Sequence, residues 1–342
     1  MITKRRQFLR WGSSIFFTHL PWQSALAGAD FQGKSVLSTQ TRPSVWRERA
    51  LIGFGTTLWL RAAHTNADQL ESALNDAVKT IRSVEADMCL FSVDSALSRL
   101  NRDGVLNKPS VHMLSVLSLS RHVSARSQGA FDVTIQPLWT VWSQAQASDS
   151  LPSHKQLQRN VKLVNWRALE VTSDSVRLNI RGMGVSLNGI ARGYAADLVR
   201  SVLQSHGVTQ ALIDTDDTAT LGNAPDDKPW RFGIESAANV KTQGPAIVAD
   251  GRGMATSSDA HTTFTPDHLH HHIFNPHTGD SPRYWSSATV IAPSCAMADA
   301  LTKVFFMCPP QLIHSTARAW GVDVIMQDKN GNWLNTLPSA LS

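Results

Sequence analysis

Cysteine is scarce in this chain. Only Cys89, Cys295 and Cys308 occur among 342 residues. An odd, widely spaced set excludes a closed disulfide framework, and none of the three has the spacing of a metal site. We expect three buried free thiols, with a Cys295–Cys308 bridge as the alternative in an oxidising compartment.

The chain also has no long apolar run, and its first 29 residues contain no acidic side chain. No segment approaches the roughly 20 apolar residues that a transmembrane helix needs, so we expect no membrane span. The chain is 42% hydrophobic and 17% charged, which is typical of a folded globular protein. The first 29 residues hold four of the 32 basic side chains and no acidic one. The rest of the chain therefore has 28 basic and 27 acidic side chains. This balance excludes the basic footprint of a nucleic-acid-binding protein.

The basic N-terminus has the pattern of an export signal. Arg5 and Arg6 precede Phe-Leu-Arg and a modestly apolar stretch, and Ala25-x-Ala27 suits a signal peptidase. We predict a twin-arginine signal peptide over residues 1–29, one large domain over 30–342, and a periplasmic location. A basic amphipathic N-terminal helix is the alternative.

The rest of the chain predicts an α+β fold. Strand-like runs are punctuated by helical periodicity without regular βα alternation. Asn66 or Asp68 can cap a helix that runs to about Asp87, and Ser110 can cap a second one. We also expect short strands near 161–164 and 183–187, and a helix that begins at Ala298.

The run from Val185 to Asp197 is the most informative stretch. An apolar segment ends in a small-residue turn, Asn188-Gly189, and leads directly into a helix with Arg192 in its first turn. Such corners present backbone N–H groups and a helix N-terminus to a phosphate. The alternative is a glycine that only lets the chain bend.

Six stretches in this order resemble the FAD:protein FMN transferase (ApbE) family. The resemblance covers about residues 50 to 310. The stretches are Phe54–Thr57, Met88–Asn101, Gly129–Leu138, the turn at 185–197, Ala255–Asp259 with His271–Gly279, and Ala298–Leu301.

The resemblance implies a single α+β domain and an activity. That activity is Mg²⁺-dependent cleavage of FAD, with transfer of FMN to a Thr or Ser hydroxyl of an exported or membrane-bound acceptor protein and release of AMP. It also implies a flavin site. Phe54 matches a family Met that touches the flavin, Phe91 matches a stacking Tyr, and Ala130-Phe131-Asp132 match a triplet along the nucleotide. Core packing for each Phe and a turn-forming role for Asp132 are the alternatives.

The same resemblance implies which residues lie at the pyrophosphate of FAD and at the acceptor hydroxyl. Ser186 and Arg192 stand where the family has an Asp and a Lys that line the pyrophosphate site, and Arg keeps the charge there. His272 matches a family His that is a candidate base for the acceptor hydroxyl. A transition-metal cluster of His268, His270, His271 and His272 is the rival interpretation.

The metal end departs from the pattern. Asp299 matches a family Mg²⁺ ligand, which the family pairs with a backbone carbonyl near Gly189 and a Thr four residues on. That fourth residue is Lys303, so Thr302 can substitute only if the helix is rewound by about 100°. An ammonium at this place competes with the cation or replaces it. Helix capping is the alternative role for Asp299.

Other departures lie near the same site. Asn188 replaces a glycine, Asn275 replaces an Asp, and Asp216-Asp217-Thr218 stands where the family has Gly-Gly-Asp. Two hypotheses follow. The site is either rebuilt, with Asp214, Asp216 or Asp217 recruiting the metal, or it has lost catalysis and serves as a flavin-binding homologue or FAD carrier.

Overall fold

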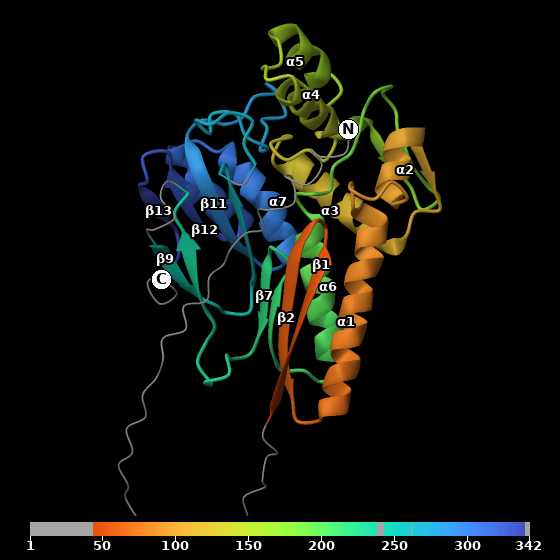
Figure 1. Cartoon of the computed structure of the whole chain (residues 1–342). Coiled ribbons are helices and arrows are strands. Elements are labelled where there is room, and N and C mark those ends of the chain that lie inside the picture. Colours follow the sequence, from red (N-terminus) through yellow and green to blue (C-terminus); the bar gives the residue numbers. More distant parts are fainter. Residues whose placement is uncertain (1–43, 238–242, 261, 339–342) are drawn as a thin grey trace, which may run out of the picture.

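An eight-stranded antiparallel sheet forms the centre of the molecule. The computed structural model describes residues 44–237, 243–260 and 262–338, so the predicted signal peptide lies outside the described residues. The strand order in the sheet is β1-β2-β6-β7-β10-β11-β12-β13 (Figure 1). The strands are β1 Val45–Gly53, β2 Thr56–His64, β6 Gln210–Asp214, β7 Thr218–Leu221, β10 Gly253–Ser258, β11 Trp285–Ala292, β12 Asp323–Asp328 and β13 Trp333–Asn335.

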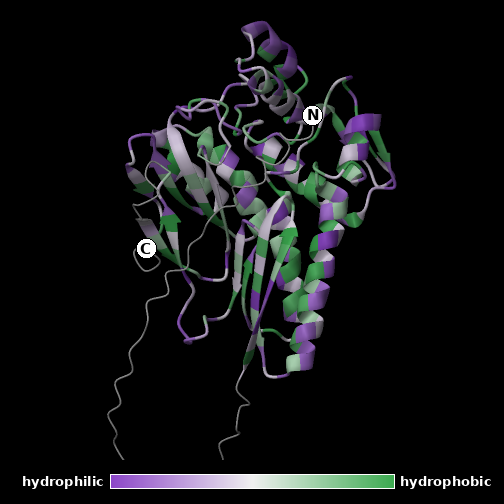
Figure 2. Cartoon of the chain, in the orientation of Figure 1, coloured by the Kyte–Doolittle hydropathy of each residue, from purple (hydrophilic) through white to green (hydrophobic). Residues whose placement is uncertain are grey.

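Helices cover one face of this sheet. Those with a long apolar stripe pack directly on the strands, and in Figure 2 the outward side of α1 is the more hydrophilic one. The expected caps are confirmed: the Asn66 side chain accepts from Asp68 N and Gln69 N, and Ser110 accepts from Met113 N. The helices are α1 Ala67–Met88, α2 Ala96–Asp103, α3 Val111–Arg126, α4 Gln136–Ala147, α5 His154–Val161, α6 Ala191–Ser205, α7 Cys295–Phe306 and α8 Ile313–Trp320, with 3₁₀ turns at Trp166–Ala168 and Pro310–Leu312.

Separate apolar clusters fill the spaces between the layers. The α1 and α6 helices bury Leu74, Ile81 and Val199 against β2 and β6. The α7 helix packs with α3 and α8 in a second cluster against β11 and β12. A hairpin of β8 (Arg231–Glu235) and β9 (Gln243–Val248) covers the opposite face of the sheet, where Phe232 and Ile291 belong to one apolar cluster. A third sheet joins β3 Val105–Asn107, β5 Ser175–Leu178 and β4 Leu169–Val171.

The α+β prediction is confirmed, but several local expectations were wrong. Residues 161–164 end α5 and turn, and 183–187 makes only one parallel bridge, Ile135 to Gly184. The α7 helix begins at Cys295, where Ser294 accepts from Met297 N, so Asp299 lies inside the helix and does not cap it. The α2 and α4 helices and the strands β1, β7 and β10 were not anticipated as such, because short amphipathic segments carry little periodicity.

The cysteines are free thiols, as expected. Cys89 and Cys295 are buried, whereas Cys308 is half-buried. Cys295 Sγ donates to Thr218 O (3.1 Å), and burial raises the pKa of this thiol. No helix in the described part of the chain has the length and apolar character to cross a bilayer.

Candidate functional site

The two predicted flavin-facing phenylalanines come together at the β1–β2 turn. Phe54 and Gly55 form this two-residue turn with φ of 50° and 82°, the geometry of a tight hairpin. Phe54 N donates to Glu85 Oε1 on α1 (2.8 Å). A Cβ built on Gly55 would lie 3.3 Å from the Phe91 ring, so that ring lies over the turn. Phe54 is partly buried against the core, whereas Phe91 is 73% exposed and can meet a ligand.

Asp132 is engaged in holding its own loop. Its carboxylate accepts from Thr134 N (2.8 Å), Thr134 Oγ1 (2.7 Å) and Trp166 N (3.0 Å). Burial raises the pKa of Asp132, and these hydrogen bonds oppose the rise. The neighbouring Phe131 is buried and Ala130 is partly buried. These contacts are those of a turn-forming residue, the alternative that the sequence had left open.

The segment before α6 is clamped from both sides. Asn101 on α2 donates through Nδ2 to Val185 O (2.8 Å) and accepts from Val185 N (2.6 Å). Ser186 N donates to Val133 O (2.7 Å), and Ser186 Oγ accepts from Asn188 N (3.4 Å). The turn through Gly189 then opens α6, whose first residues have no side-chain cap. The predicted corner is therefore present, with the first turn of α6 left uncapped.

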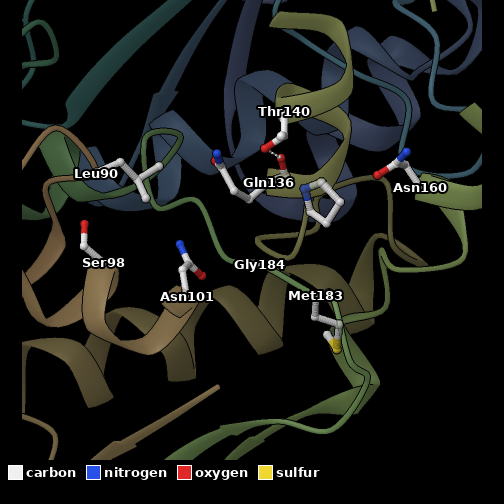
Figure 3. Close-up of a pocket in the computed structure, with 10 residues that line it drawn as sticks. Leu90, Ser98, Asn101, Gln136, Thr140, Asn160, Met183 and Gly184 are labelled. Carbon is white, nitrogen blue, oxygen red and sulfur yellow. Dashed lines mark hydrogen bonds between the residues drawn. The ribbon is translucent and has the colours of Figure 1, made fainter. Parts of the chain in front are cut away.

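A pocket of about 420 Å³ lies beside this segment. Ser98 and Asn101 reach into it from α2, Gln136 from the start of α4, and Leu90 from the loop that carries Phe91 (Figure 3). The sequence motifs contained these residues, but only the fold identifies them as lining residues. The remaining lining residues are Pro137, Thr140, Asn160, Gly182, Met183 and Gly184.

Arg192 forms an ion pair with one of the residues that depart from the family pattern. Its Nη1 lies 2.6 Å from Asp216 Oδ2. Asp216 adopts a positive φ of 77°, a conformation that favours glycine and that Asp tolerates. Burial alone would lower the pKa of Arg192, but the carboxylates of Asp216, Asp217 and Asp299 outweigh it and raise that pKa. This arginine therefore stays charged.

The loop at 214–217 brings further carboxylates to the first turn of α6. Thr215 Oγ1 donates to Arg192 O (2.9 Å), and Asp216 N donates to Asp214 Oδ1 (2.9 Å). Burial raises the pKa of Asp214 to about 6. Burial, together with the Asp299 carboxylate, raises the pKa of Asp217 well above its ordinary value. Burial therefore disfavours the ionised form of both carboxylates.

Asp299 is paired with Lys303 one helical turn later. Lys303 Nζ forms an ion pair with the Asp299 carboxylate and donates to Asp299 O (3.1 Å). A Cβ built on Gly189 would lie 2.9 Å from Lys303 Cε, so the lysine stem crosses this turn. The Thr302 hydroxyl donates to Asp299 O (2.7 Å) and is hydrogen-bonded to Ser257 Oγ on β10 (2.7 Å). The α7 helix is continuous here, so the rewinding that would redirect Thr302 does not occur.

Close packing of α6 on α7 brings these charged groups together. A Cβ on Gly193 would lie 2.4 Å from Cys295 O, so glycine is needed at this crossing. The Asp197 carboxylate accepts from Cys295 N (2.9 Å) and Ala296 N (3.0 Å) at the start of α7. The crossing thus places Arg192 and Asp299 in one electrostatic cluster.

The histidines at 268–272 point to different neighbours. His270 packs on the Trp142 ring at 4.8 Å, and His271 lies 6.0 Å from Phe306. The ring Nε2 of His271 donates to Pro282 O (3.0 Å), and burial lowers its pKa to about 4. The ring Nδ1 of His272 donates to Thr262 O (3.2 Å). Among the described residues no group of three or more His, Cys, Asp or Glu side chains is arranged to hold a metal ion, so the histidine-cluster interpretation gains no support.

Comparison with known proteins gives the same family. A sequence model of the ApbE family matches residues 54–326. The FAD:protein FMN transferase of Escherichia coli (strain K12) is 27% identical over 296 residues, 82% of this chain and 84% of that protein. The enzyme of that name from Vibrio cholerae is 27% identical over 275 residues, 78% and 79% of the two chains.

Solved structures show the same fold. The flavin transferase ApbE from Vibrio cholerae superposes with a TM-score of 0.74 at 22% identity, over 87% of this chain and 98% of that one. The flavinyl transferase ApbE of Pseudomonas stutzeri, in its apo form, has a TM-score of 0.74 at 23% identity, over 87% and 96%. Because the family model spans most of the chain, this protein belongs to the ApbE family.

Proposed function

We propose that this protein transfers FMN from FAD to a threonine or serine hydroxyl of an acceptor protein and releases AMP. The observation that carries the proposal is the charged Arg192 in the first turn of α6, which has no side-chain cap. Helix N-termini and guanidinium groups both bind phosphate oxygens. Curated relatives that cover most of this chain carry the name of this activity.

The flavin end of FAD has a matching surface. Phe91 is exposed beside the Phe54 turn and can stack on an isoalloxazine ring. Leu90 joins this loop to the pocket between Asn101 and Gln136, whose size is in the range of cofactor sites. Asn101 and Gln136 supply amide groups that can hydrogen-bond to polar edges of the nucleotide.

The transfer is a phosphoryl substitution. The acceptor oxygen forms a bond to the phosphorus that bears the riboflavin, and the pyrophosphate P–O bond breaks so that AMP leaves with the bridging oxygen. His272 is our candidate for accepting the hydroxyl proton, because it stands at the position of the family's candidate base and its Nδ1 contact with Thr262 O fixes the ring. Arg192 stabilises negative charge on the phosphates.

The residues present do not fit the Mg²⁺ site that the resemblance implies. Asp299 and the turn at Gly189 are in place, but Lys303 Nζ is paired with Asp299, and Thr302 is committed to Ser257. Mg²⁺ requires near-octahedral oxygen ligands at about 2.0–2.1 Å, and the Lys303 ammonium already occupies the Asp299 carboxylate that would be one of them. The proposed transfer therefore uses the side chains of this protein and no metal ion.

A flavin-binding homologue or FAD carrier is the second candidate function. Arg192 and Lys303 are each already paired with a carboxylate, Asp216 and Asp299. A phosphate has to compete with these carboxylates, which reduces the positive charge available to stabilise the transition state of transfer.

One assay separates the two functions. The purified full chain is incubated with FAD and a domain that carries a flavin-accepting threonine. Covalent FMN on that domain, detected by mass, with equimolar AMP supports the transferase. Tight FAD binding with neither product supports the carrier.

Export through the twin-arginine route to the periplasm is part of the proposal. It rests on Arg5 and Arg6 and on the cleavage pattern before residue 30. The double variant Arg5→Lys, Arg6→Lys should leave the protein in the cytoplasmic fraction of the producing cells. Equal periplasmic recovery of variant and wild type would exclude this route. The acceptor we propose is accordingly an exported or membrane-bound protein.

A further inference from the structure

The Lys303 ammonium is held in a defined position between α7 and the start of α6. It is held by the carboxylate of Asp299 and by Asp299 O at 3.1 Å, while its stem passes over Gly189 at the entrance of α6. The Asp299 side chain is 2% exposed and that of Lys303 is 19% exposed. The cation is therefore anchored on a buried carboxylate and keeps a limited opening to solvent.

Gly189 leaves room for the Lys303 side chain. Its φ lies outside the left-handed region, so the backbone does not itself require glycine there. A Cβ would instead lie 2.9 Å from Lys303 Cε and 3.4 Å from Nζ. The missing side chain at 189 leaves the volume that the lysine stem occupies.

The contacts of the Lys303 ammonium leave one of its N–H donors for a ligand. The ammonium has three N–H donors, of which Asp299 takes two through its carboxylate and its carbonyl. The third is available to a phosphate oxygen. Arg192 supplies a second positive charge, with Asp216 and Asp217 as the counter-charges of the same cluster.

We infer that Lys303 takes the place of the divalent cation, so that this protein binds the pyrophosphate of FAD with two side-chain cations and needs no Mg²⁺. This rests on the proposed function, since it names how the same site recognises its substrate. A lysine is a compact point charge that binds phosphate without a fixed geometry. Loss of a charged hydrogen bond of this kind corresponds to about a tenfold loss of affinity.

The test compares the full-length wild type with two variants at this position. Lys303→Met removes the charge, whereas Lys303→Thr also restores a hydroxyl one turn after Asp299. FAD affinity is measured by flavin fluorescence in EDTA and in Mg²⁺, and metal binding by calorimetric titration with Mn²⁺ alone. Lys79→Thr is the matched control, because Lys79 also pairs with an Asp on its own helix but its side chain is 78% exposed.

We expect the wild type and the Lys79→Thr control to bind FAD equally with EDTA and with Mg²⁺. Lys303→Met should bind about tenfold more weakly in both conditions. Lys303→Thr should bind weakly in EDTA, regain affinity with Mg²⁺, and alone bind Mn²⁺. Circular dichroism verifies that the variants fold, and if they do not, the wild-type comparison decides.

A tenfold loss of wild-type FAD affinity in EDTA, or Mn²⁺ binding by the wild type, would overturn the inference. Asp217 Oδ2 and Asp299 Oδ2 are buried with no hydrogen-bond partner, so a metal held there beside Lys303 is the specific outcome that Mn²⁺ titration would reveal. Metal-independent FAD binding without covalent transfer would leave this inference standing and contradict the proposed function.

Discussion

Gly193→Ala tests whether the contact between α6 and α7 builds the site. The added Cβ would lie 2.4 Å from Cys295 O, 2.5 Å from Cys295 C and 2.7 Å from Ala296 N. All three atoms are backbone, so no side chain can rotate away, and the start of α7 has to shift. Overpacking of this kind costs about 3 kcal/mol at the upper end of its range. The higher helix propensity of alanine relative to glycine offsets about 1 kcal/mol of this cost.

We therefore expect the free energy of unfolding to fall by about 2 kcal/mol, measured by urea denaturation followed by circular dichroism. Gly233→Ala is the control, because nothing lies within 4 Å of the Cβ it adds on β8. It should change stability by less than about 0.5 kcal/mol. FAD affinity should fall in Gly193→Ala only, since Arg192 and Asp299 then move apart. Equal stability of the two variants would refute the argument.

Two further outcomes follow from Asp214 and Phe91. The pKa of Asp214 in the folded protein, about 6, lies above its ordinary value of 3.8. Its stabilising contribution is therefore present below about pH 4 and is lost as the pH rises through 6. Asp214→Asn keeps an acceptor for Asp216 N. Its free energy of unfolding should exceed that of the wild type by up to about 3 kcal/mol at pH 7 and should equal it at pH 3.5. A difference between the two proteins that does not change with pH would contradict this. Phe91→Ala should leave thermal stability unchanged and weaken FAD about tenfold in a fluorescence titration. Val93→Ala, at a residue 75% exposed on the same loop, should change neither, and an equal loss in both would exclude stacking by Phe91.

Much of the fold could be predicted where periodicity was long. The α1 helix and its Asn66 cap agree with the sequence expectation, because five apolar positions recur at helical spacing and the cap is a local contact. The segment 183–187 was expected as a strand and is extended without a full ladder. Asn101, 84 residues away, pairs with the backbone of Val185 instead of a neighbouring strand. Contacts of that separation leave no local signal.

The candidate site, like the fold, was predicted from the sequence only in part. The residue types and their order alone determined the family resemblance, the phosphate corner and the departures at Lys303 and Asp216. Only the tertiary structure decided what the departures do, because pairing depends on which helices cross. The loop at 214–217 places Asp216 against Arg192, and the packing of α6 on α7 at Gly193 groups Arg192 with Asp299. The missing side chain at Gly189 lets the Lys303 stem lie where the resemblance had placed a metal.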